Sequence, residues 1–228
     1  MSKAGFGGGT GILVMPVLAL LIDPRESLGL MLPLLLACDV ISLYFFWGQW
    51  DPRNLVLLSA GAAVGIIAGS LALDAISTEA LSRFIGGIAI AFAMIQVARN
   101  WLPARREPWR PTGWLGVVVG FGTGFVSTLA HVGGVLTTMF LLAQRLDSRR
   151  FVATTTAVYF LINAGKVLPY WYLGTLDEEM LLFDLPLLPV VLAGTILGVL
   201  LNRRVSGEWF TRIVLVFVLI TGLQLLLG

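Results

Sequence analysis

The sequence predicts an all-α, polytopic membrane protein made of two inverted repeats, each a re-entrant, broken-helix hairpin followed by three transmembrane helices. Three observations predict this fold. The chain is 57% hydrophobic and 12% charged, whereas a soluble domain has about 25% charged residues. Apolar runs follow one another along the whole chain, and one motif recurs with the opposite loop charge. We therefore expect about eight helical segments in a lipid bilayer.

The apolar runs are the candidate spans, and they cover residues 11–22, 28–47, 55–73, 81–97, 114–143, 151–173, 181–201 and 210–227. Most have the roughly 20 residues that a helix needs to cross the hydrocarbon layer. Two do not fit this length. The run 11–22 is short, and the run 114–143, at about 1.5 Å per residue, would extend well beyond a layer of about 30 Å.

Arginines flank the long run on both sides: Arg99, Arg105, Arg106 and Arg110 precede it, and Arg145, Arg149 and Arg150 follow it. The positive-inside rule assigns both clusters to the cytoplasm. A single crossing would separate them, whereas a hairpin that turns back at residues 131–134 keeps both on one side. We therefore expect a re-entrant hairpin here; the alternative is that every run is a plain crossing.

The repeat is a spaced motif, Gly65-x3-Gly69-x7-Ser77-x-Glu79-x3-Arg83, which recurs as Gly194-x3-Gly198-x7-Ser206-x-Glu208-x3-Arg212. Glycines four apart allow close helix packing, and a serine followed by a glutamate favours a helix start. The loop carries Asp74 in the first copy but Arg203 and Arg204 in the second. Opposite charges are expected of two copies on opposite membrane faces.

We therefore divide the chain into a first repeat (1–101), a basic cytoplasmic linker (102–112) and a second repeat (113–228). Few apolar residues precede the first glycine cluster, although some 17 precede the second. The first arm of the first hairpin is thus expected to be truncated, or the true start lies upstream.

Two glycine clusters are candidate anion-binding sites: Gly8, Gly9 and Gly11 in the first hairpin, and Gly133 and Gly134 in the second. A membrane helix broken at glycine exposes backbone N–H groups at the start of the next half-helix. Those donors and the helix dipole favour an anion. The alternative is that these glycines only allow close packing.

Lys166 lies in the middle of a predicted span, where an ammonium group needs a counter-ion, and a substrate anion would provide one. Asn163, one turn earlier, shares its helix face. Thr155, near the start of that helix, is expected to line the path or to bond its own backbone. The alternatives for Lys166 are snorkelling to the surface and a fixed pair with Asp39.

Asp39 and His131 are the candidate proton-coupling residues. Asp39 lies midway along its run, where it would pair with Lys166, carry a proton, or do neither. His131, the only histidine, would hold substrate oxygens, relay a proton, or simply stabilise the hairpin tip.

Enzymatic and cofactor roles are not expected. Ser127 lies four residues before His131, but the chain has no Gly-x-Ser-x-Gly elbow, so no catalytic residues are assigned. One cysteine, Cys38, and one histidine cannot complete a zinc site. The glycines near the N-terminus lack the Lys-Ser/Thr of a nucleotide loop, and a net charge of +2 does not indicate nucleic acid.

These motifs resemble the sulfite exporter TauE/SafE family of membrane permeases. The resemblance is carried by Gly-Phe-Gly-Gly-Gly-Thr-Gly-Ile-Leu-Val-Met-Pro at 5–16, by Ala153-Thr154-Thr155 leading through Asn163 and Lys166 to Gly174, and by the repeated Gly-x3-Gly with its trailing arginine. It implies a bacterial or archaeal inner-membrane permease for sulfite or small organosulfur anions such as sulfonates. Two features depart from the family: the short first hairpin arm, and Ala-His-Val-Gly-Gly where a run of glycines is usual.

Together these features predict a secondary carrier in which broken-helix N-termini and Lys166 bind a small anion by alternating access. A proton is the candidate coupling ion, and no ATP use is expected. The alternatives are a non-transporting membrane assembly factor and an anion channel. Anion flux into liposomes separates the first from a carrier, and saturable counterflow separates the second.

Overall fold

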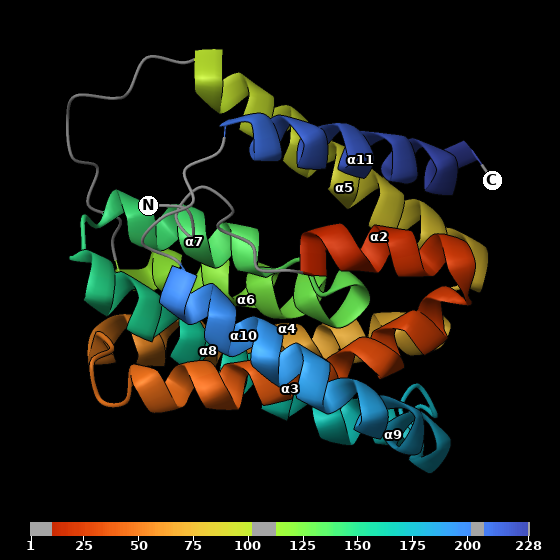
Figure 1. The fold of residues 1–228 in the computed structure, drawn as a ribbon, viewed down its shortest axis with the longest axis horizontal. Helices are drawn as coiled ribbons and strands as arrows, with labels where there is room; N and C mark the ends of the chain where they lie inside the picture. The colour runs from red at the N-terminus through yellow and green to blue at the C-terminus, as the bar shows by residue number, and fades with distance from the viewer. Residues whose placement is uncertain (1–10, 102–112, 202–207, 228) are drawn as a thin grey trace.

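The structure, a computed structural model, describes residues 11–101, 113–201 and 208–227. Every regular element in this part of the chain is helical (Figure 1). In order they are α2 (Gly11–Leu21), α3 (Pro24–Phe45), α4 (Pro52–Ala75), α5 (Thr78–Trp101), α6 (Gly113–Ala130), α7 (Gly134–Ala143), α8 (Ser148–Tyr172), α9 (Glu178–Asp184), the 3-10 turn η1 (Leu185–Leu187), α10 (Leu188–Leu201) and α11 (Glu208–Leu227). The all-α prediction is confirmed.

Five helices are long and apolar enough to cross a membrane: α3, α4, α6, α8 and residues 78–97 of α5. Their outward-facing side chains are apolar, for example Val56 at 66% exposed and Leu71 at 68% exposed on α4. Lipid favours such a surface, and helices satisfy their backbone hydrogen bonds internally. The chain is therefore a multi-pass membrane protein, as predicted.

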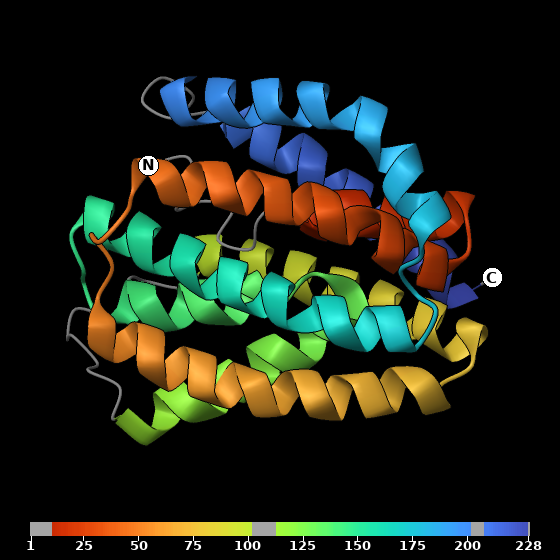
Figure 2. The ribbon, with the colours of Figure 1, turned by 90° about the horizontal axis from the view of Figure 1, so that it is seen from below.

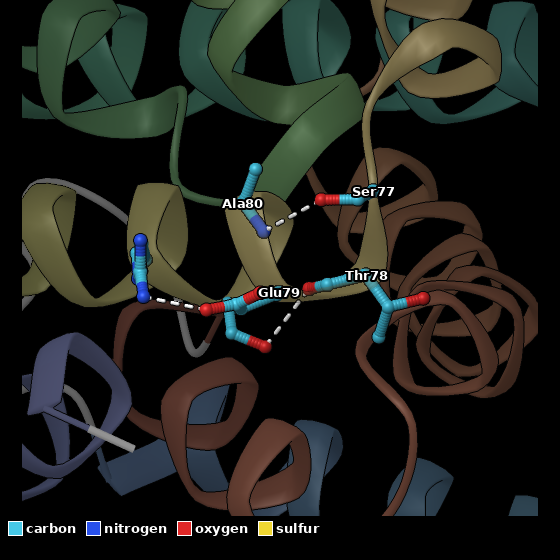
Figure 3. A network of polar contacts seen from close by, with 6 residues as sticks. Ser77, Thr78, Glu79 and Ala80 are labelled. Carbon is cyan, nitrogen blue, oxygen red and sulfur yellow. Dashed lines mark hydrogen bonds and ion pairs between the residues drawn. The ribbon is translucent and has the colours of Figure 1, made fainter.

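Acidic and hydroxyl caps begin several helices. Asp23, Asp51 and Asp147 accept N–H bonds from the first turns of α3, α4 and α8, at 2.7 to 2.9 Å for the shortest bond of each. Ser77 Oγ accepts the Ala80 N–H at 3.2 Å at the start of α5, where Glu79 pairs with Arg83 (Figure 3). The predicted serine–glutamate helix start is confirmed in the first copy of the repeat. Ser206, in the second copy, lies outside the described residues.

The long run 114–143 folds as a hairpin. The chain reverses between α6 and α7, and α7 returns along α6 towards the end from which α6 begins (Figure 2). The Oγ1 atoms of Thr123 and Thr137 lie 3.1 Å apart across the hairpin. A Cβ added at Gly133 would lie 2.1 Å from the Thr123 carbonyl oxygen. The predicted turn at residues 131–134 is confirmed, and the plain-crossing alternative is wrong for this run.

The loops separate into two groups at opposite ends of the helices. At one end, Thr154 Oγ1 accepts the Asp51 N–H at 2.9 Å, and the Asn54 and Gln144 amides exchange bonds of 2.9 and 2.7 Å. At the other end, Arg25 donates to the Ile76 carbonyl at 2.6 Å. Arg145, Arg149 and Arg150, from the second arginine cluster, lie at the first end. Arg105, Arg106 and Arg110, from the first cluster, lie outside the described residues.

Helix packing pairs the segments of the two predicted repeats. α4 packs on α6 and α8, α3 packs on α8 and α10, and α5 packs on α11. If the second repeat is aligned on the first, α3 corresponds to α8 and α4 corresponds to α10. The α4–α8 contact in this alignment is then equivalent to the α3–α10 contact. Division into repeats at residues 1–101 and 113–228 stays a prediction.

The run 181–201 is not one continuous helix. It contains the end of α9, then η1, then α10. Pro186 and Pro189 lie in this segment, and proline has no N–H for an intrahelical bond. The expectation of a single span here is corrected for that reason.

Candidate functional site

Lys166 is fully buried, at 0% exposed, although it lies in the middle of the α8 span. Its Nζ lies 2.8 Å from His131 Nδ1 and donates to Ser127 Oγ at 3.1 Å and to the Ser127 carbonyl at 3.2 Å. The side chain therefore reaches the tip of the α6–α7 hairpin and does not snorkel to the surface.

His131 joins this lysine to α3. Its Nε2 lies 3.0 Å from the Leu28 carbonyl oxygen, and that oxygen can only accept. Nε2 therefore carries the hydrogen, which leaves Nδ1 of a neutral ring free to accept a bond from Lys166. The backbone of His131 has φ 52, the left-handed conformation that turns the chain out of α6.

The glycines of the turn sit directly beside this cluster. Gly133 and Gly134 are buried, and a Cβ at Gly133 would lie 3.0 Å from Ser127 Cβ. Bonds within the turn use the N–H groups of His131, Val135 and Leu136. The N–H groups of Val132 and Gly133 have no acceptor in the part of the chain that the structure describes. They lie at the positive end of the α7 helix dipole.

Tyr170 closes one side of the cluster and was not predicted from the sequence. It is 0% exposed, its hydroxyl donates to the Thr128 carbonyl at 2.6 Å, and its ring centroid lies 5.9 Å from Lys166 Nζ. The spacing in the sequence could have identified Tyr170 as a neighbour of Lys166, because it follows Lys166 by four residues and shares its helix face. Ser127 was considered only as a nucleophile, yet it is the main hydroxyl contact of Lys166.

Asn163 and Asp39 lie next to the cluster, one turn along α8. Asn163 is buried and its Nδ2 donates to Asp39 Oδ2 at 2.7 Å. Asp39, on α3, is half-buried. Asn163 therefore contacts the Asp39 carboxylate. The alternatives for Asp39, a pair with Lys166, proton carriage or neither, stay predictions.

Thr155 is not brought to Lys166, and the first glycine cluster is described only in part. Thr155 donates to the carbonyls of Phe151 at 3.0 Å and Val152 at 2.9 Å, the backbone bonding weighed as its alternative. At about 1.5 Å per residue it lies roughly 16 Å from Lys166 along α8. Gly11 is the first residue of α2, which packs on α3, α5 and α11. Gly8 and Gly9 lie outside the described residues.

An all-helical, multi-pass membrane protein with a re-entrant hairpin whose tip contacts a buried lysine has the features of a broken-helix transporter. Comparison with known proteins also indicates a membrane transporter and identifies its family. The family model for "Sulfite exporter TauE/SafE" matches residues 1–225. The chain belongs to this family of membrane transporters.

One curated relative has a similar description. "Probable membrane transporter protein y4hK" of Sinorhizobium fredii (strain NBRC 101917 / NGR234) is 28% identical over 187 residues, which cover 78% of this chain and 73% of the relative. No solved structure matches the chain. The family and this relative are transporters, in agreement with the expectation of a non-enzymatic role.

Proposed function

We propose that this protein is a secondary carrier of a small anion, sulfite or an organosulfur anion such as a sulfonate, in the inner membrane of its cell. The observation that supports this most strongly is the complete burial of Lys166 at the hairpin tip, where its hydrogen bonds go to neutral acceptors. A buried cation loses hydration, and neutral acceptors replace it only in part. A bound anion would offset the remaining cost.

The anion would bind between α8 and the hairpin tip. Lys166 Nζ would exchange one of its present acceptors for the anion, and the Ser127 hydroxyl provides a further donor. The N–H groups of Val132 and Gly133, which have no acceptor among the described residues, provide backbone donors. Asn163, one turn from Lys166, would orient the solute. Donors at the start of a half-helix suit oxyanions because the helix dipole adds to the hydrogen bonds.

Transport by alternating access requires the two ends to open in turn. The Asn54–Gln144 amide pair holds the arginine-rich end together, and Tyr159 Oη donates to the Gly134 carbonyl at 2.8 Å at the hairpin tip. The Arg25–Ile76 bond lies at the opposite end. His131 and Asp39 are the groups that would couple opening to a proton, since both lie at or beside the Lys166 cluster.

Counterflow of radiolabelled sulfite in proteoliposomes tests this function. Wild-type protein should show saturable counterflow, and Lys166→Ala should lower it at least about tenfold, as expected when a charged hydrogen-bond donor to the substrate is lost. Leu168→Ala, on the same helix but 63% exposed, is the matched control and should transport normally.

Two results would contradict the proposal. Non-saturable flux without counterflow would indicate a channel. The absence of flux of sulfite and of sulfonates, from protein that remains folded, would indicate a non-transporting assembly role.

A further inference from the structure

The ionisable groups around the site limit the charge that it can neutralise. Lys166 is the one lysine or arginine buried among the described residues. The titratable groups at the site are Lys166 on α8, His131 at the hairpin tip and Tyr170 on α8, with Asp39 on α3 behind Asn163. Among the residues that the structure describes, the positive charge available to a bound solute therefore comes from the lysine and the histidine.

The hydrogen bonds of His131 restrict this pair to a single positive charge. Its Nε2 hydrogen is held by the Leu28 carbonyl, so the contact of 2.8 Å between Nδ1 and Nζ needs one donor and one acceptor. If both groups were charged, two donors would face each other at this distance. Lys166 and His131 together thus carry at most one positive charge, whichever of the two nitrogens holds the proton.

The remaining contacts do not supply a second charge. The Ser127 hydroxyl and the turn N–H groups are neutral donors, and the Tyr170 hydroxyl is already bonded to the Thr128 carbonyl. Asp39 adds negative character on the other side of Asn163. In a water-poor interior, an uncompensated charge is strongly disfavoured.

We propose that the site is selective for singly charged anions and discriminates by charge against doubly charged anions of the same shape. This inference rests on the proposed function, since it concerns the anion that the Lys166 site binds. It follows from the His131–Lys166 contact and the fixed Nε2–Leu28 bond, and it predicts that a monoanionic sulfonate binds better than a dianionic oxyanion.

Methanesulfonate and sulfate test the proposal, because both are tetrahedral sulfur oxyanions of similar size with one and two negative charges. Binding to the purified full-length protein is measured from the ligand-dependent shift of its unfolding temperature at pH 7.5 and constant ionic strength. Methanesulfonate is expected to bind at least about tenfold more tightly than sulfate, and its binding should be lost in Lys166→Gln.

Asp39→Asn separates charge from shape. It keeps the side-chain size but removes the neighbouring carboxylate, so the preference for methanesulfonate should fall at least about threefold if charge sets it. An unchanged preference would mean that the methyl group is recognised, and this would overturn the inference. Equal binding of sulfate and methanesulfonate by the wild type would overturn it as well. If neither they nor sulfite bind or move, the proposed function itself fails.

Discussion

At the residue scale, Lys166 shows how an ammonium group is held in the middle of a transmembrane helix. Its three N–H donors match three acceptors: the Ser127 carbonyl, the Ser127 hydroxyl and His131 Nδ1. All three acceptors are neutral, so these hydrogen bonds replace the hydration of the ammonium group only in part. Under the proposed function, a bound anion would offset the remaining cost.

Tyr170 offers a test of how far this cluster is structural. Tyr170→Phe keeps the ring beside Lys166 but removes the bond to the Thr128 carbonyl, which is buried. The free energy of unfolding should fall by about 1 to 2 kcal/mol, because a buried acceptor loses its partner. The measurement is unfolding of the purified protein in detergent, followed by sulfite counterflow.

Tyr172→Phe is the matched control for this substitution. Tyr172 is 80% exposed and lies two residues away on the same helix, so its replacement should leave stability unchanged. Equal stability of the two variants would show that the Tyr170–Thr128 bond contributes nothing.

At the element scale, glycines set how closely the hairpin approaches its neighbours. On α4, a Cβ added at Gly65 would lie 2.1 Å from the Phe121 carbonyl oxygen of α6. The equivalent glycine in the second copy of the repeat, Gly194 on α10, has nothing within 4 Å. The first glycine of the motif therefore contacts a neighbouring helix in the first copy, whereas a Cβ at the equivalent glycine of the second copy would meet no described atom.

This contrast predicts different effects of the same substitution. Gly65→Ala should destabilise the protein by roughly 1 to 3 kcal/mol, because the backbones of α4 and α6 must separate. Gly194→Ala should be neutral or slightly stabilising, since alanine favours the helix by up to about 1 kcal/mol. Thermal unfolding of both variants decides this; a loss of stability in Gly194→Ala equal to that in Gly65→Ala would contradict the difference in packing.

At the scale of the whole molecule, the hairpin determines which loops share a membrane face. Because α7 returns beside α6, the start of α8 lies at the same end as the α3–α4 loop. The loop before α9 lies at the other end, where Gly29 on α3 packs against the Thr175 carbonyl. Arg145, Arg149 and Arg150 thus lie at one end and the acidic segment 177–179 at the other.

Single cysteines report this arrangement in intact cells. Arg150→Cys and Glu178→Cys, both at exposed positions, are introduced with Cys38→Ser so that no other thiol is present. A membrane-impermeant maleimide added outside should label residue 178 but reach residue 150 only after the membrane is opened. Labelling of both positions from one side would contradict the hairpin topology.

The sequence by itself determined the features that act along the chain. Apolar length predicted the spans, loop arginines predicted the hairpin, and Ser77 with Glu79 predicted the start of α5, because hydropathy, charge and capping act locally. Proline chemistry could also have predicted the interruption before α10, which the apolar run concealed.

Only the tertiary structure decided which groups surround Lys166. Ser127, His131 and the Leu28 carbonyl come from α6, the hairpin tip and α3, and the His131–Leu28 contact joins residues 103 apart in sequence. Their meeting depends on how α3, α6 and α8 pack, through contacts between small and apolar faces that carry no local signal. For the same reason the sequence left open which groups Asp39 would contact, and the packing placed Asn163 against its carboxylate.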